Sequence, residues 1–284
     1  MRTVSLPSGC TLPALGLGTW HLGESAQSRP REVAAVRHAL EIGYRVIDTA
    51  EMYGEGGSEE VVGQALAEAF AAGTLTRADV YVVSKVLPHH ASRKGVVAAC
   101  DASRRRLRLD TLDLYLLHWR GSTPLQDTLI GFEALRGRGQ IGAWGVSNFD
   151  VDDLQELMAL EDGVRCAANQ VYYSLTEQGP GVALLPWQQQ HRMPLMAYSP
   201  IDQGALARHT GLRELALQRG ATPAQLALAW LMQQPQVMAL PKAVSAAHLR
   251  ENVEAADLVL TEAEGAALAR LFPPPARKPP LAMR

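Results

Sequence analysis

The sequence predicts a closed (β/α)8 TIM barrel, and three observations lead to that prediction. Short apolar runs alternate with helical patterns along the 284 residues, and strict alternation of strands and helices indicates a parallel sheet. Eight such units can be counted, which favours a closed barrel over an open doubly wound sheet. No linker or low-complexity stretch divides the chain, so residues 1–284 are expected to form one domain with a Pro-rich tail at 273–284.

Each element follows from a local pattern. The TVSL and CTLP segments around Pro7-Ser8-Gly9 predict an N-terminal β-hairpin. The first four units are predicted as strands at 15–20, 45–49, 80–85 and 112–119, followed by helices at 31–42, from Ser58, near 92–108 and near 125–137. The last four units are predicted as strands at 141–148, 166–171, 194–200 and 237–242, followed by helices from Asp152, near 181–191, from Pro223 after a loop, and from Ser245 to about Ala255. An extra C-terminal helix is expected at 261–271.

Composition excludes several classes of protein. Hydrophobic residues make up 47% and charged residues 20%, and the net charge of −2 offers no general attraction to nucleic acid or to anionic membranes. No run of about 18 apolar residues exists to span a membrane. Cys10, Cys100 and Cys166 are scattered without metal-ligand spacing, and no apolar segment precedes Cys10 as an export signal would require. A cytoplasmic protein is therefore expected.

Polar side chains end every predicted strand from the second to the eighth. Such a barrel places its chemistry at the carboxyl ends of its strands, so these side chains are the candidates for a functional site. Any one of them could be a structural polar group, but their shared position at one rim indicates a site. They are Asp48 and Tyr53 after strand two, Lys85, His118, Ser147 with Asn148, Gln170, Tyr198 and Lys242.

Four of these residues can act together on a carbonyl group. A phenol has a pKa of about 10, and a nearby ammonium lowers that value at about 1.4 kcal/mol per unit. Asp48 can keep a buried Lys85 charged, and Lys85 can acidify Tyr53. Tyr53 would then give a proton to a carbonyl oxygen that His118 orients through a hydrogen bond.

The chain resembles the aldo-keto reductase family along essentially its whole length. Eight stretches carry the resemblance, each weak alone and specific together: LGLGTW, IDTAEMYG, VVSKV, DLYLLHW, WGVSNF, NQVYYSL, MAYSP and LPKAVSAAHLREN. The resemblance implies that Tyr53 is the general acid, that Lys85 and Asp48 tune it, and that His118 positions the substrate carbonyl. It also implies that a bound nicotinamide supplies a hydride, which no side chain can do, and that no metal is needed.

The resemblance further assigns the nicotinamide cofactor to particular residues. Ser147, Asn148 and Gln170 would hold the carboxamide, Tyr198 would stack on the ring, and the segment 199–211 would fold over the pyrophosphate. Glu251 and Asn252 match residues that reach the adenine. The remaining residues expected at the cofactor are Gly18, Thr19, Trp20, Ser199 and Ile201.

The choice of cofactor depends on the residues around Lys242. Neither Gly16-Leu-Gly18 nor Gly54-Glu-Gly56-Gly57 completes a Rossmann GxGxxG motif. The start of a helix after the last strand is instead the usual phosphate site of such barrels. Lys242 matches a family residue for the 2′-phosphate of NADPH, although Ala243 and His248 stand where the family commonly has Ser and Arg. NADPH is therefore expected, with NADH possible.

The substrate is expected to be small. By resemblance, Trp20 and Trp119 line the substrate pocket, and Met52 lies beside Tyr53. The loop RGSTP after strand four is very short, whereas relatives that bind bulky substrates generally use longer loops there. The chain looks most similar to bacterial methylglyoxal-reducing members of the family, which implies an aldehyde or 2-oxoaldehyde substrate and a monomer.

Two other functions are alternatives to a reductase. A non-catalytic subunit that senses nicotinamide nucleotides could retain the same four residues, but the chain has no long docking loop. A metal-dependent hydrolase would need His and carboxylates clustered at several strand ends, and these are missing. His89-His90 has no further ligand at suitable spacing, and Arg104-Arg105-Arg106 lies near a predicted helix C-terminus as a solvated basic face.

Overall fold

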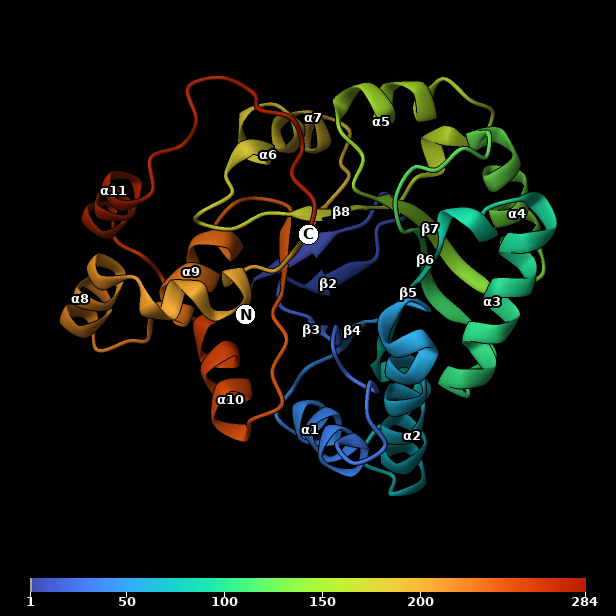
Figure 1. The fold of residues 1–284 in the computed structure, drawn as a ribbon, viewed down its shortest axis with the longest axis horizontal. Helices are drawn as coiled ribbons and strands as arrows, with labels where there is room; N and C mark the ends of the chain where they lie inside the picture. The colour runs from blue at the N-terminus through green and yellow to red at the C-terminus, as the bar shows by residue number, and fades with distance from the viewer. Residues whose placement is uncertain (1) are drawn as a thin grey trace.

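A computed structural model describes residues 2–284 and confirms the predicted barrel (Figure 1). The expected antiparallel hairpin is formed by β1 (Thr3–Ser5) and β2 (Thr11–Pro13). The barrel strands follow one another around the sheet in chain order, each parallel to its neighbour: β3 (Leu17–Gly18), β4 (Val46–Asp48), β5 (Tyr81–Val86), β6 (Leu112–Leu117), β7 (Ile141–Ser147), β8 (Asn169–Tyr172), β9 (Leu195–Tyr198) and β10 (Val237–Leu240).

The barrel closes where the first strand meets the last. Parallel bridges join Leu15 to Ala239 and Gly18 to Lys242. A Cβ atom on Gly18 would lie 2.7 Å from the carbonyl oxygen of Leu240, a distance at which the two strands would have to separate. The Gly16-Leu-Gly18 stretch therefore serves the close approach of two backbones at the barrel seam.

Helices surround the strands, and most begin and end near the predicted residues. The structure differs after β9, where the segment expected to be a loop contains the 3₁₀ helix η5 (Asp202–Arg208) and α8. The predicted sixth helix is also divided into two short ones. The helices are α1 (Arg29–Glu41), α2 (Gly57–Ala71), α3 (Arg93–Leu107), α4 (Leu125–Gly137), α5 (Val151–Met158), α6 (Gly179–Val182), α7 (Leu184–Gln190), α8 (Thr210–Arg219), α9 (Pro223–Met232), α10 (Ala246–Ala255) and α11 (Glu262–Leu271).

The unexpected helix α8 has clear local causes. Its first turn is capped by the ring of His209, which accepts a hydrogen bond from the backbone N–H of Leu212. Gly220 ends it in the left-handed conformation, with φ of 67°. Only Leu212 and Ala216 of this helix are buried, so its apolar stripe is too narrow to show in the sequence pattern. The helix packs with α9 and α11 in a second apolar cluster beside the main core.

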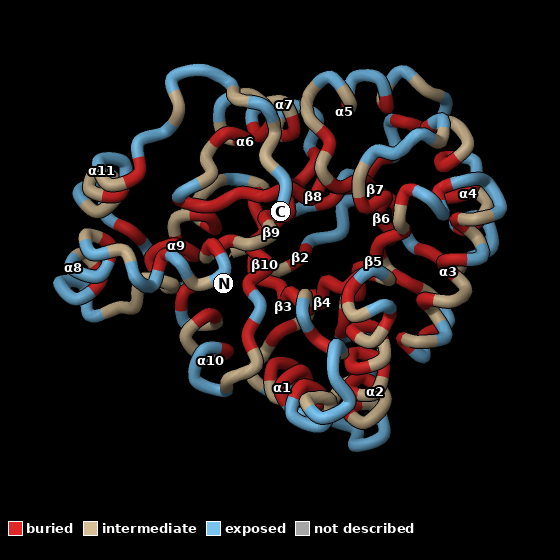
Figure 2. The backbone as a smooth tube through the Cα atoms, viewed as in Figure 1, coloured by how far each residue is buried: buried red, intermediate tan, exposed pale blue. Residues whose placement is uncertain are grey.

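Burial is concentrated in the strands and in the inward faces of the helices (Figure 2). Between β6, β7 and α4, for example, the rings of Phe132 and Trp144 stack with centroids 5.6 Å apart. This packing fixes the strands, so side chains at their carboxyl ends are held on a rigid base. Among residues 2–284, no helix is long and apolar enough to cross a membrane.

Candidate active site

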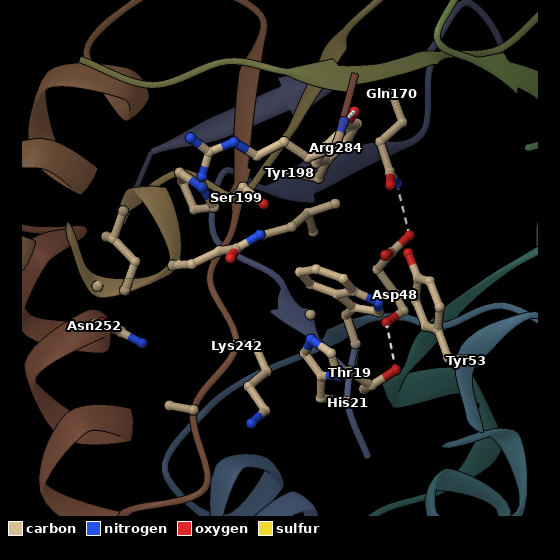
Figure 3. Close-up of a pocket in the computed structure, with 18 of the residues that line it drawn as sticks. Thr19, His21, Asp48, Tyr53, Gln170, Tyr198, Ser199, Lys242, Asn252 and Arg284 are labelled. Carbon is tan, nitrogen blue, oxygen red and sulfur yellow. Dashed lines mark hydrogen bonds between the residues drawn. The ribbon is translucent and has the colours of Figure 1, made fainter. Parts of the chain in front are cut away.

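One large cavity opens at the carboxyl ends of the barrel strands. Its volume is about 910 Å³, near the upper end of the range of about 300–1,000 Å³ that is usual for ligand sites. Every residue predicted for the site lines this cavity except Lys85, which is fully buried behind it. Figure 3 shows Asp48 and Tyr53 on one side of the cavity and Lys242 and Asn252 on the other.

A tight turn delivers Tyr53 to the cavity wall. β4 ends at Asp48, the N–H of Tyr53 then donates to the carbonyl of Ala50 at 3.1 Å, and the 3₁₀ helix η1 (Tyr53–Gly56) follows. Gly54 and Gly56 have φ of 57° and 93°, a region in which glycine avoids the strain of other residues. The glycine-rich stretch therefore shapes the turn that aims the phenol, and it does not form a phosphate-binding loop.

Lys85 connects the other members of the predicted set. Its Nζ donates to Asp48 Oδ2 at 2.8 Å, to the carbonyl of Thr49 at 2.9 Å and to the hydroxyl of Tyr53 at 3.1 Å. The second oxygen of Asp48 accepts from Gln170 Nε2 at 2.7 Å (Figure 3). All three donors of the ammonium and both carboxylate oxygens are thus satisfied without water.

Burial changes the ionisation of this cluster in a direction that the sequence did not predict. Burial opposes the charge of Lys85, but Asp48 and the Tyr53 hydroxyl outweigh it, and the pKa of Lys85 is raised. Burial raises the pKa of Tyr53, and the ammonium of Lys85 offsets only part of that rise. The predicted net acidification of Tyr53 is therefore wrong for this structure. The phenol stays protonated at neutral pH and retains a proton to donate.

His118 faces Tyr53 as a neutral imidazole. The two rings meet edge to face with centroids 5.7 Å apart. Burial, helped by the charge of Lys85, lowers the pKa of His118 to about 2. Its Nδ1 is buried without a hydrogen-bond partner among the described residues. A neutral imidazole donates from only one ring nitrogen, so His118 can offer a single hydrogen bond to a ligand.

The predicted carboxamide-binding residues form one hydrogen-bond network. Ser147 Oγ donates to the carbonyl of Gln170 at 2.8 Å, and Asn148 Nδ2 donates to the carbonyl of His118 at 3.0 Å. The hydroxyl of Tyr198 donates to Asn148 Oδ1 at 3.0 Å. Asn148 has φ of 60°, an uncommon conformation for a residue other than glycine, and such conformations cluster at functional sites.

The opposite side of the cavity suits an anion. Lys242 is exposed there, and α10 begins four residues after it, at Ala246. The side chain of Ser245, the residue before the helix, makes no capping hydrogen bond, so the first N–H groups of α10 lack the side-chain partner that usually satisfies them. Ala243 and His248 lie beside them in the cavity wall. A cationic side chain beside uncapped amide donors is chemistry that fits a phosphate group.

Apolar side chains and several unpredicted residues complete the cavity. Trp20, Met52 and Trp119, the three residues predicted for a substrate pocket, line it. Four further lining residues, Pro200, Gln203, Gly204 and Ala207, belong to the segment 199–211 that was expected over the pyrophosphate. Sequence reasoning missed His21, Thr222, Pro223, Ala224, Leu240, Met283 and Arg284. His21 follows a predicted residue directly and could have been found by extending the strand. The tail residues carry no pattern that would place them at the barrel mouth. Among residues 2–284, no group of three or more His, Cys, Asp or Glu side chains could hold a metal ion.

A closed barrel with a phenol and a carboxylate at the wall of one cavity, and an ammonium buried behind them, has the architecture of an enzyme that acts on small molecules. Residues 14–272 match the Aldo/keto reductase family. The chain is 44% identical over 287 residues to methylglyoxal reductase YeaE of Escherichia coli, covering 99% of both proteins. It is 34% identical to methylglyoxal reductase DkgA of Salmonella typhimurium, covering 94% of this chain and 92% of that protein.

Solved structures agree with these sequence relatives. An aldo/keto reductase from Klebsiella pneumoniae, crystallised with NADP and acetate, is 48% identical and superposes with a TM-score of 0.95, covering 100% of this chain and 99% of that one. The aldo-keto reductase Tm1743, bound to the inhibitor epalrestat, is 37% identical with a TM-score of 0.88, covering 95% and 100% respectively. The chain therefore belongs to the aldo/keto reductase family and is an oxidoreductase.

Proposed function

We propose that the protein reduces small aldehydes and 2-oxoaldehydes of the methylglyoxal type to alcohols, with NADPH as reductant. The observation that carries the proposal is the Tyr53 hydroxyl at the cavity wall, 3.1 Å from the buried Nζ of Lys85 and opposite the neutral ring of His118. The relatives named as methylglyoxal reductases support the choice of substrate.

In this proposal Tyr53 is the general acid. A phenol is protonated at neutral pH at its ordinary pKa of about 10, and burial raises the pKa of Tyr53 further, so a proton is present to donate to a carbonyl oxygen that gains negative charge. The resulting phenolate would be stabilised by the ammonium 3.1 Å away, which Asp48 keeps charged. His118 would hold the same oxygen by one hydrogen bond, because its imidazole is neutral.

A nicotinamide dinucleotide would occupy this cavity. A bound nicotinamide supplies the hydride that protein side chains cannot. Ser147, Asn148, Gln170 and Tyr198 would hold the ring side, and Lys242 with the start of α10 would hold the 2′-phosphate. The other residues proposed to bind the cofactor are Gly18, Thr19, Trp20, Ser199, Ile201, Ala243, His248, Glu251 and Asn252, all of which line the cavity.

The substrate would bind between Tyr53 and an apolar wall. Trp20, Met52 and Trp119 supply that wall, and Met52 is 40% exposed, so this part of the cavity opens to solvent. A small carbonyl compound needs few polar contacts beyond the one that orients its oxygen. This arrangement favours small aldehydes over sugars, which would require several hydrogen-bonding partners.

The decisive experiment follows the absorbance of NADPH with methylglyoxal, a simple aromatic aldehyde and a sugar as substrates. Tyr53→Phe is expected to lower kcat by at least about 100-fold, the usual contribution of a general acid, while the Kd for NADPH changes by less than about twofold. The ring and the Lys85–Asp48 pair remain in this variant, so the fold is retained. Tyr81→Phe is a matched control, because Tyr81 lies at the opposite end of β5 from Lys85.

The outcomes distinguish a reductase from a non-catalytic subunit that senses nicotinamide nucleotides. Turnover of methylglyoxal by the wild type, lost in Tyr53→Phe and kept in Tyr81→Phe, supports the proposal. Tight binding of NADPH without turnover of any carbonyl compound would refute it and would favour nucleotide sensing. Equal turnover by Tyr53→Phe and the wild type would show that another group donates the proton.

A further inference from the structure

The Pro-rich tail at 273–284 crosses the barrel mouth and reaches the cavity. In Figure 1 it runs from α11 over α6 and α7 to the centre of the barrel. Lys278 Nζ forms an ion pair with Asp150 Oδ2 at 2.8 Å, and Pro279 packs so closely on Gly179 that a Cβ there would lie 2.7 Å from its ring. These contacts hold the tail in place along its path.

Arg284 is the part of the tail that contacts the cavity wall most extensively. Its backbone N–H donates to the hydroxyl of Tyr198 at 3.2 Å, and its guanidinium lies over the ring of Tyr172 at 4.8 Å from the centroid. Its Nη1 forms an ion pair with Oδ1 of Asp202, the same oxygen that accepts from the hydroxyl of Tyr172 at 2.7 Å. Figure 3 shows the Arg284 side chain extended beside Ser199.

Asp202 lies in the segment 199–208 after β9 and begins its 3₁₀ helix η5. It is 8% exposed, and its φ of 51° is in the left-handed region, as are those of Ser199 and Gln203. Such conformations are strained in residues other than glycine and persist only where neighbouring contacts hold them. Ser199, Ile201 and Gln203 line the cavity on either side of Asp202. A carboxylate at this place would repel a dinucleotide phosphate unless a cation neutralised it.

We propose that Asp202 and Arg284 form a clasp that fastens the tail to the covering segment 199–208 and holds that segment closed over the dinucleotide. The inference rests on the proposed function, because the dinucleotide is the ligand that the segment would cover. Asp202 and Arg284 are positioning residues that act on the dinucleotide through the covering segment. The clasp has two effects: it keeps a strained segment ordered, and it neutralises the carboxylate beside the phosphates.

The clasp can be tested by measuring NADPH dissociation rather than turnover. Stopped-flow fluorescence with excess NADP⁺ as competitor gives the dissociation rate for the wild type, Arg284→Ala, Asp202→Asn and the double variant. A partly exposed ion pair contributes about 1 kcal/mol, so Arg284→Ala is expected to raise the dissociation rate about fivefold. Adding Asp202→Asn to Arg284→Ala should recover part of the loss, because the unpaired carboxylate is then removed.

Two controls make the result specific. Arg277 is an exposed cation of the same tail, and it forms no ion pair among residues 2–284. Arg277→Ala should therefore leave the dissociation rate unchanged. Arg284→Lys keeps the charge and should restore most of the wild-type rate. The effect of Arg284→Ala should shrink at high salt, where the ion pair is screened.

The clasp and the proposed function fail in different ways. If the wild type binds NADPH and Arg284→Ala dissociates at the rate of Arg277→Ala, the clasp is refuted and the reductase proposal stands. Strictly additive effects of Asp202→Asn and Arg284→Ala on the dissociation rate would also refute the clasp, because two residues in direct contact must couple. If the wild type binds no NADPH, the cofactor assignment fails and the clasp fails with it.

Discussion

Replacing Asp48 with Asn leaves the buried ammonium of Lys85 without its counter-charge. Asp48 accepts from Lys85 through Oδ2 and from Gln170 Nε2 through Oδ1, at 2.8 and 2.7 Å. The Asn amide has one acceptor oxygen and one NH₂ donor. One of the two donors, Lys85 Nζ or Gln170 Nε2, would therefore face another donor, and only a flip of the Gln170 amide would restore that hydrogen bond. The substitution preserves shape and volume, and its effect is therefore electrostatic.

The expected loss of stability can be estimated from the contacts of Lys85. Removing one partner of a buried ion pair costs about 3–5 kcal/mol. Nζ retains hydrogen bonds to the Thr49 carbonyl at 2.9 Å and to Tyr53 at 3.1 Å, which places the loss near about 3 kcal/mol. The loss of the counter-charge also lowers the pKa of Lys85 relative to the wild type.

The loss should depend on pH in a direction that identifies Lys85. In the wild type the pKa of Lys85 is raised, so its contribution to stability is complete below the unfolded pKa of about 10.4. In Asp48→Asn burial dominates and the folded pKa falls below the unfolded one. The unfolded chain then binds more protons, and the stability of the variant rises with pH. The difference from the wild type should be greatest near pH 7 and should narrow toward pH 10.

Thermal unfolding followed by circular dichroism at pH 7, 8.5 and 9.5 measures this difference. A loss of about 3 kcal/mol lowers Tm by roughly 6–12 °C in a chain of this size. Asp127→Asn is the control, because its partner Arg93 is 60% exposed and surface pairs contribute little. Asp48→Asn with Lys85→Met removes both charges and should regain most of the Tm. A Tm for Asp48→Asn equal to that of the control, or falling further as pH rises, would refute the reasoning.

Three further predictions concern the cofactor, the histidine and the barrel seam. Lys242→Ala should weaken the binding of NADPH about ten- to a hundredfold in equilibrium titrations and the binding of NADH much less, since only NADPH carries the 2′-phosphate. An equal loss of affinity for both cofactors would show that the 2′-phosphate does not bind at Lys242. Between pH 6.5 and 4.5 the free energy of unfolding of the wild type should fall by up to about 2.7 kcal/mol more than that of His118→Gln. The reason is that the unfolded histidine binds a proton in this range, whereas the folded histidine, with a pKa of about 2, does not. Parallel curves of Tm against pH for the two proteins would contradict this. Gly18→Ala should lower the free energy of unfolding by about 1–3 kcal/mol, because the added Cβ lies 2.7 Å from the Leu240 carbonyl oxygen. The control Gly137→Ala in α4, whose Cβ has nothing within 4 Å, should raise it by about 0.5–1 kcal/mol. A free energy of unfolding for Gly18→Ala equal to that of the control would argue against close contact of the strands at the barrel seam.

Local patterns were sufficient to predict the barrel and the residues at its rim. Each strand is an apolar run, and each ends in polar residues that the parallel topology must bring to one edge. Asp48, Tyr53 and His118 therefore meet at the cavity although they are far apart along the chain. α8 could not be predicted in this way, because only two of its residues are buried and its cap is a histidine.

Features that depend on tertiary packing were beyond the sequence. The net rise in the pKa of Tyr53 results from complete burial, which residue types and spacing do not reveal. Gln170 donates to Asp48 as well as lining the cavity, and only the folded chain shows that double position. The tail likewise has no pattern that places Arg284 beside Tyr198, because its path depends on contacts with α6 and the residue before α5.

The enclosure of Lys85 has a chemical consequence for the proposed reduction of aldehydes. An unprotonated amine attacks such compounds and forms a Schiff base, which would end catalysis at that site. Lys85 is fully buried, is absent from the cavity wall and has a raised pKa, so the nucleophilic lone pair is neither available nor within reach. A primary amine can thus lie one side chain away from the proposed aldehyde substrate without forming an adduct with it.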